Sequence, residues 1–174
     1  MAIRKILTEP DPFLRQKSTI VDKVDNEIRI LMDDMLETMY SAPGIGLAAI
    51  QVGVPKRVIV IDLSKDGEKK NPLYFVNPEI ITRSKQDASY EEGCLSVPNQ
   101  FAEISRPDTC KVKFLDYEGN KKTLEAEGLL ATCIQHEIDH LEGILFIDYL
   151  SKLKKNMIIK KLSKQKKSLE RIVV

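Results

Sequence analysis

The chain contains only two histidines, and both lie in one short segment that reads QHEIDHL from 135 to 141. On a helix, His136 and His140 would share a face with their Cβ atoms roughly 5–6 Å apart, so that both imidazoles can bind one metal ion. Glu137 follows the first histidine, where its carboxylate can reach a water on that metal, as in the H-E-x-x-H pattern of metal-assisted hydrolysis. The alternative is a surface helix that carries two histidines, but the mostly apolar stretch 129–134 favours a buried helix. The segment therefore predicts a metal centre in which Glu137 moves the protons.

A third protein ligand is needed, because a catalytic metal centre usually has three protein ligands and one open position. The chain has no third histidine, so this ligand must be a cysteine or a carboxylate. Cys133 shares a helix face with His136, but its side chain would point away from a metal held between the two histidines. Cys94 lies between a glycine and a proline, where a loop can turn its thiolate inward. The residues alone favour Cys94 and leave Cys133 open, whereas Cys110 is interpreted as a small buried hydrophobe.

The elements that must position these residues follow from hydrophobic spacing and turn residues. An amphipathic helix is predicted over 26–40, capped by Asp25 or Asn26 and ended by the Pro-Gly pair that comes after it. The histidine segment belongs to a buried helix over 129–141, closed by Gly143. Strands are predicted over 57–63, 73–76, 111–117 and 122–126, and a final basic helix over 151–171. Strands in the middle of the chain with helices at its start and end indicate an α+β fold.

Length and composition are those of an ordinary globular domain. With 174 residues, 43% of them hydrophobic and 30% charged, the chain can bury roughly two-thirds of its unfolded surface. The N-terminal residues lack the apolar core of a signal peptide, and no run is long enough to span a bilayer. The three cysteines cannot all pair, and free thiols fit a reducing compartment. We therefore expect residues 1–174 to form one cytoplasmic domain without a membrane partner.

The net charge of +1 hides an uneven distribution. Residues 151–174 carry nine Lys or Arg and one Glu, whereas residues 1–150 carry 18 basic and 25 acidic side chains. A basic tail on an acidic body often marks contact with a polyanion. The alternative is the solvated face of a terminal helix that packs on the body.

Three segments together resemble the motifs of one family, peptide deformylase. The G-x-G-L-A-A-x-Q motif of that family is matched by GIGLAAIQ at 44–51, its E-G-C-L-S motif by 92–96, and its Q-H-E-x-D-H-L motif by 135–141. Order and spacing match as well, so the resemblance covers essentially the whole chain, and the basic helix resembles the tail of the bacterial type. The resemblance implies mainly antiparallel sheets around a central metal-binding helix, with one further helix N-terminal and another C-terminal to them.

The resemblance also implies an activity and a metal. The family removes the formyl group from the N-formylmethionine that begins a new polypeptide and releases formate. Its metal ligands correspond to Cys94, His136 and His140 here, which decides between Cys94 and Cys133. The resemblance implies one divalent ion per chain, with Fe(II) as the native metal and Zn or Ni as replacements.

The same resemblance assigns roles in the reaction. A hydroxide on the metal would attack the formyl carbon, with Glu137 acting first as general base and then as general acid. The side-chain amide of Gln51 and the backbone N–H of Leu95 would stabilise the oxyanion. Without the resemblance, Gln51 would be interpreted as a surface glutamine that follows an apolar run.

The substrate site is likewise implied by the resemblance. The peptide backbone would be clasped by the segments that contain Gly44, Ile45, Gly46, Glu92 and Gly93, as an added strand. The methionine side chain would enter a pocket that involves Ile45, Tyr90, Leu129, Thr132, Cys133 and His136. Tyr90 and Thr132 stand where relatives have aliphatic residues, and Phe101 stands where a basic residue often steadies the peptide.

The tail and two rival functions complete the predictions. The family's helical tail docks on the ribosome, so the resemblance implies the same for 151–174, by salt-dependent attraction to RNA phosphates and without recognition of a nucleotide sequence. A small metallopeptidase would share the H-E-x-x-H pattern, because that pattern alone does not distinguish formamide from peptide cleavage. A non-enzymatic His2Cys metal carrier or copper electron-transfer site would share the ligands but leave Glu137 without a role.

Overall fold

The computed structural model describes residues 1–172; Val173 and Val174, the last two residues of the predicted domain and of its basic tail, lie outside them. Helix α1, Asn26–Ser41, begins where the sequence predicts. The carboxylate of Asp25 accepts a hydrogen bond from the backbone N–H of Ile28 at 3.0 Å, which satisfies one of the free donors in the first turn. The helix ends at Ser41, and its C-cap Ala42 stands directly before the Pro-Gly pair, as expected.

Five antiparallel strands form the main sheet, in the order β1-β2-β3-β6-β7. Their bounds are Gly46–Ala48 for β1, Val58–Ile61 for β2, Leu73–Arg83 for β3, Thr109–Leu115 for β6 and Lys121–Glu127 for β7. Four of the five match predicted strands, although β3 is much longer than the predicted 73–76, and β1 was not predicted. Strands β6 and β7, which correspond to the predicted strands 111–117 and 122–126, pair with each other antiparallel.

Both faces of this sheet are covered, which explains why all four residues of β2 are buried. Successive side chains of a strand point to opposite faces. Val58 and Val60 pack with the apolar face of α1, which contributes Leu31, Met32, Met35 and Met39. Ile59 and Ile61 pack on the other face with helix α2, Gly128–Leu141, through Ala131, Ile134, Ile138 and Leu141.

A second, two-stranded sheet is the part of the fold that hydrophobic spacing does not predict. Strands β4, Asp87–Cys94, and β5, Val97–Pro107, form a long antiparallel hairpin. Many of its side chains are polar and only partly buried, so the apolar alternation that marks a strand is weak. The prediction that Cys94 lies in a loop is wrong in detail: Cys94 is the last residue of β4 and pairs with Val97 at the tip of the hairpin.

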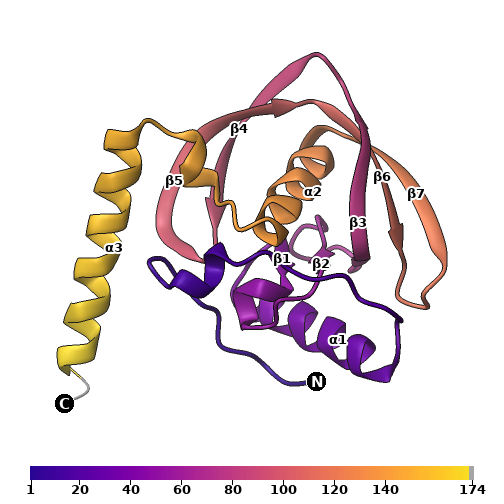
Figure 1. The fold of residues 1–174 in the computed structure, drawn as a ribbon, viewed down its shortest axis with the longest axis horizontal. Coiled ribbons are helices and arrows are strands. Elements are labelled where there is room, and N and C mark those ends of the chain that lie inside the picture. The colour runs from indigo at the N-terminus through magenta and orange to yellow at the C-terminus, as the bar shows by residue number, and fades with distance from the viewer. Residues whose placement is uncertain (173–174) are drawn as a thin grey trace.

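Helix α2 lies between the main sheet and this hairpin, at the centre of the fold (Figure 1). It ends where the sequence predicts, and Gly143 after it has a φ of 74°, a left-handed conformation that suits glycine. The α+β fold with mainly antiparallel sheets around a central helix is confirmed.

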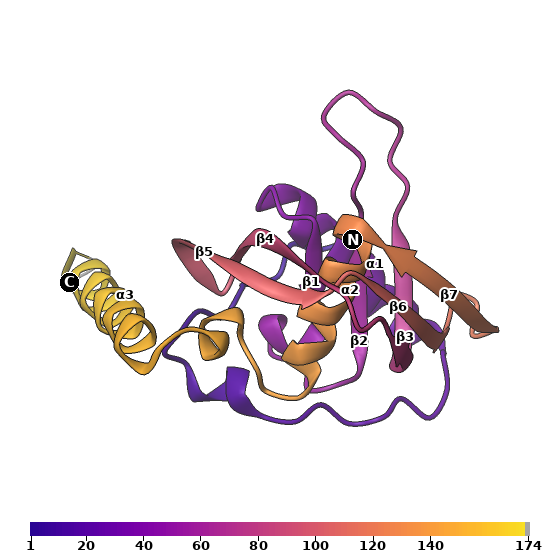
Figure 2. The same ribbon diagram turned by 90° about the horizontal axis from the view of Figure 1, so that it is seen from above.

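Helix α3, Lys152–Ile172, lies at one end of the molecule, on the far side of the hairpin from the main sheet (Figures 1 and 2). Leu162 is its one buried side chain among the described residues, and it packs in a cluster with Val97, Ile104 and Phe146. Within residues 1–172, no helix is both long and apolar enough to cross a membrane.

Candidate metal centre and catalytic cleft

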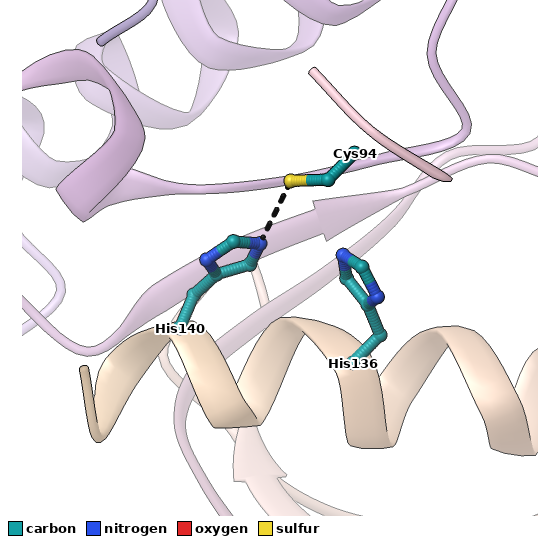
Figure 3. A group of neighbouring side chains, drawn as sticks. All are labelled: Cys94, His136 and His140. Carbon is teal, nitrogen blue, oxygen red and sulfur yellow. Dashed lines mark hydrogen bonds between the residues drawn. The ribbon is translucent and has the colours of Figure 1, made fainter. Parts of the chain in front are cut away.

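Helix α2 presents His136, Glu137 and His140 toward the hairpin. The two histidines are one turn apart, their ring centroids are 5.0 Å apart, and both side chains are buried. Their spacing on one helix face agrees with the prediction from sequence. Figure 3 shows both rings rising from the helix toward the same point.

Cys94 reaches that point from the tip of the hairpin. Its Sγ lies 3.3 Å from Nε2 of His140 (Figure 3). One ligand atom from each of Cys94, His136 and His140 lies within 4.8 Å of the others, and this is the set of side chains in residues 1–172 that could hold a metal ion. Cys133, the alternative ligand from sequence, does not belong to it.

A buried ion-pair network holds the ring of His136. Glu92 accepts a hydrogen bond from Nδ1 of His136 at 2.8 Å and two more from Arg106, at 2.7 and 3.0 Å. Burial raises the pKa of Glu92, but the bonds from His136 and Arg106 outweigh it, so this pKa lies below its usual value. An ionised carboxylate only accepts hydrogen bonds, so Nδ1 must carry a hydrogen. When Nε2 gives up its own proton, it is therefore the ring nitrogen that can bind a metal.

The ion-pair network around Glu92 and Arg106 also reaches Asp139, near the C-terminal end of the histidine motif. Arg106 also donates to Asp139 at 2.8 Å, and Tyr149 donates to the same carboxylate at 2.6 Å. Neither Arg106 nor Tyr149 was predicted from the sequence, because Arg106 lies in the long hairpin that was not predicted. Glu92 was expected at the substrate site, but not as the partner of Arg106 and His136. The position of Asp139 inside the histidine motif was the one available clue.

The charges of the cluster suit a cation. Burial lowers the pKa of His136, but Cys94 and Glu92 beside the ring outweigh it and raise this pKa well above its usual value. Burial, with His136 next to it, lowers the pKa of His140 well below its usual value. The two rings therefore favour one positive charge between them, next to a thiol and two carboxyl groups.

Glu137 is buried beside this cluster, and its Oε2 has no hydrogen-bond partner among the described residues. Burial raises the pKa of Glu137 to about 7, near the value at which a carboxyl group can both take and give a proton at neutral pH. Gly46 of β1 lies against it, since a Cβ built on Gly46 would be 2.5 Å from Oε1. An unpaired buried carboxylate next to two imidazoles and a thiol fits a divalent metal ion with a reacting molecule beside it.

Gln51 is buried next to Cys94, which differs from the surface position that the residues alone would suggest without the resemblance. Its Oε1 accepts a hydrogen bond from the backbone N–H of Ala48 at 2.9 Å, which fixes the direction of the amide. Its Nε2 donates to Oγ of Ser96 at 3.0 Å and lies 3.5 Å from Sγ of Cys94. The amide N–H group therefore points into the cluster.

A cleft of about 470 Å³ opens onto these groups. It is lined by every residue assigned to the substrate site from the sequence: Gly44, Ile45, Gly46, Tyr90, Glu92, Gly93, Leu129, Thr132 and Cys133. Leu95 lines it as well. At its mouth, Phe101 is 65% exposed, and its ring lies over Gly93, where a Cβ would be 2.6 Å from the ring.

The cluster joins two buried histidines to the partly buried Cys94, with a carboxyl group beside it, at the bottom of a cleft. This arrangement favours the class of mononuclear metal-dependent hydrolases over a closed structural site. Comparison with known proteins then identifies the family. Residues 3–156 match the model of the polypeptide deformylase family.

Relatives and solved structures agree with that match. The chain is 66% identical to a peptide deformylase of Pelagibacter ubique, over 100% of both chains. It is 62% identical to one of Phenylobacterium zucineum, over 97% of this chain and 99% of the relative. The structure of the Ehrlichia chaffeensis peptide deformylase in complex with actinonin matches with a TM-score of 0.91 and 46% identity, over 95% of this chain and 98% of that one. The chain therefore belongs to the polypeptide deformylase family of enzymes, and the family predicted from the three motifs is confirmed.

Proposed function

We propose that this enzyme hydrolyses the formamide of N-formylmethionine at the start of new polypeptides and releases formate. The proposal rests on family membership and, above all, on one arrangement: Glu137 buried beside the Cys94, His136 and His140 cluster at the bottom of the cleft. The rival metal-carrier function would leave this carboxyl group without a role.

The metal is proposed to be Fe(II), held by Cys94, His136 and His140, with Zn or Ni as possible replacements. Such an ion supplies Lewis-acid activation of water and of the formyl oxygen. Two imidazoles and one thiolate suit any of these three metals. If iron is the native ion, iron-loaded protein should lose activity faster in air than under nitrogen, and equal half-lives would count against it.

Glu137 is proposed to move the protons. Its side chain takes a proton from the attacking water and delivers it to the departing amine. Gln51 is proposed to donate a hydrogen bond from Nε2 to the oxyanion, together with the backbone N–H of Leu95. Because Ala48 and Ser96 hold the amide of Gln51 in place, this donor needs little reorganisation during the reaction.

The substrate backbone is proposed to bind as a strand between β1 and β4. In the described chain, β1 is the end strand of the main sheet, and β4 pairs only with β5. Each therefore has an edge whose backbone groups can accept an extended peptide. The methionine side chain would then enter the inner cleft beside Leu129, Thr132 and Cys133.

Substitution of Glu137 by Gln tests the proposal. The change keeps the shape of the side chain but removes the base, so kcat for formate release from a formyl-Met tripeptide should fall about 10²–10⁴-fold, with the metal content unchanged. The exposed Glu125→Gln is a matched control and should keep full activity. A variant E137Q that retains more than a tenth of the activity would overturn the role of Glu137. Hydrolysis of internal peptide bonds in preference to the formamide would favour the metallopeptidase instead.

We propose in addition that α3 docks on ribosomal RNA, as implied by its nine basic residues: Lys152, Lys154, Lys155, Lys160, Lys161, Lys164, Lys166, Lys167 and Arg171. Leu153, Met157 and Leu169 of the same helix are also exposed, so much of α3 has no contact with the body. Substitution of Lys160, Lys164 and Lys167 by Glu reverses three charges of α3. It does not change Leu162, the buried residue through which the helix packs on the body. The triple variant should pellet less with ribosomes, with a weaker dependence on salt; binding equal to that of the unchanged chain would refute the proposal.

A further inference from the structure

A second cavity of about 470 Å³ lies between β5 and α3, outside the catalytic cleft. Its apolar lining includes Phe101 from β5, Leu150 before α3, and Met157 and Ile158 of α3. Its charged lining consists of Lys154 and Lys161 of α3 and Glu103 of β5. We call it the β5–α3 groove. Phe101 and Met157 are 65% and 62% exposed. Adjoining apolar side chains left open to water in this way are typical of a surface that contacts something else.

The groove adjoins the catalytic cleft. Gln100 and Phe101 line both cavities. Phe101 pairs with Gly93 across the hairpin, and its ring lies against that residue because glycine has no side chain to displace it. The exposed ring of Phe101 is therefore the wall that the two cavities share.

We propose that the β5–α3 groove is a further subsite for the substrate, holding residues of the new polypeptide downstream of those bound in the cleft. This inference rests on the proposed function, because the substrate must enter with its formyl end at Glu137. A chain extended between β1 and β4 advances about 3.3 Å per residue, so after a few residues it leaves the cleft. Beyond Phe101, which lines both cavities, the next cavity that the chain can reach is the groove.

The groove also has a chemical preference. An apolar side chain would be sheltered by Phe101, Met157 and Ile158. The two lysines of the groove outnumber its one glutamate, Glu103, so an acidic side chain would meet a net positive charge there. A peptide that contains both leucine and glutamate is the simplest sequence that offers the groove one apolar and one acidic side chain. The groove would therefore increase the rate for new chains of that type without taking part in the chemistry at Glu137.

The test compares three formylated peptides on the metal-loaded full chain: a formyl-Met tripeptide, a nonapeptide whose downstream half alternates leucine and glutamate, and a nonapeptide with glycine and serine there. For the leucine/glutamate peptide, kcat/KM should exceed that of the glycine/serine peptide about fivefold, the effect of removing about half of an apolar side chain from water. In Met157→Glu this preference should disappear, while the rate for the tripeptide, which ends before the groove, stays within about twofold.

A charge control separates the groove from the general positive charge of α3. Lys161→Glu should reduce the rate for the leucine/glutamate peptide alone, whereas the neighbouring Lys160→Glu, whose side chain does not line the groove, should leave it unchanged. Equal losses in both variants, or equal rates for the two nonapeptides, would overturn the subsite and leave the groove to another partner. If even the tripeptide releases no formate, the proposed function itself fails.

Discussion

Substitution of Gly46 by alanine tests how closely the cleft confines Glu137. The new Cβ would be 2.5 Å from Oε1, whereas ordinary contact begins at 3.4 Å. The carboxylate must therefore move by about 1 Å, because β1 is fixed by its pairing with the buried strand β2. A misplacement of about 1 Å in a catalytic group can reduce the rate on the order of 10²-fold. The crowding should also cost about 1–3 kcal/mol of stability.

The assay is formate release from a formyl-Met tripeptide by metal-loaded G46A. The loss should fall on kcat more than on KM, since the backbone N–H and C=O of residue 46 stay available to the substrate, and the metal content should not change. Gly67→Ala is the control. Its new side chain would have nothing within 4 Å, and the φ of +85° at this position would cost about 1 kcal/mol of backbone strain. Residue 67 is not part of the cleft, so this variant should keep full activity. If G46A retains more than a third of the activity of the unchanged chain, the reasoning about Glu137 is wrong.

Three further predictions concern the buried ionisable groups. Burial raises the pKa of Glu137 to about 7 from 4.5, so between these values the folded metal-free chain binds more protons than the unfolded one and its stability falls as pH rises. Metal-free E137Q should therefore be more stable than the metal-free unchanged chain by about 3 kcal/mol near neutral to basic pH. Urea unfolding measured at a series of pH values should show this difference disappear below pH 4.5, the pKa of the glutamate in the unfolded chain. Arg106→Met leaves Glu92 buried without its cation and should cost about 3–5 kcal/mol, measured by urea unfolding of the metal-loaded protein; a loss under 1 kcal/mol would contradict the network. Burial raises the pKa of Cys133 to about 12, so this thiol should resist iodoacetamide in the folded protein and react on unfolding, as mass spectrometry of its peptide would report.

Local patterns were sufficient for the helices and most of the main sheet. The spacing of apolar residues predicted α1 and α2 nearly to the residue, because each helix buries one continuous face and has a cap or a glycine at its end. The hairpin of β4 and β5 was not predicted, because it is held by backbone pairing around α2 and by the buried Arg106 rather than by an apolar stripe. Pairing between strands depends on partners that local sequence does not identify.

The sequence by itself determined that His136, His140 and Glu137 share one region of a buried helix, since a helix has a fixed period and these residues are neighbours on it. The motifs also determined the family. Only the tertiary structure decided what meets that face. Cys94, which is 46 residues away from His140, arrives at 3.3 Å because the hairpin tip folds over the helix. Gln51 and the ion pair of Glu92 and Arg106 reach the same centre from other strands and turns, and contacts between distant elements follow from packing, which no local period encodes.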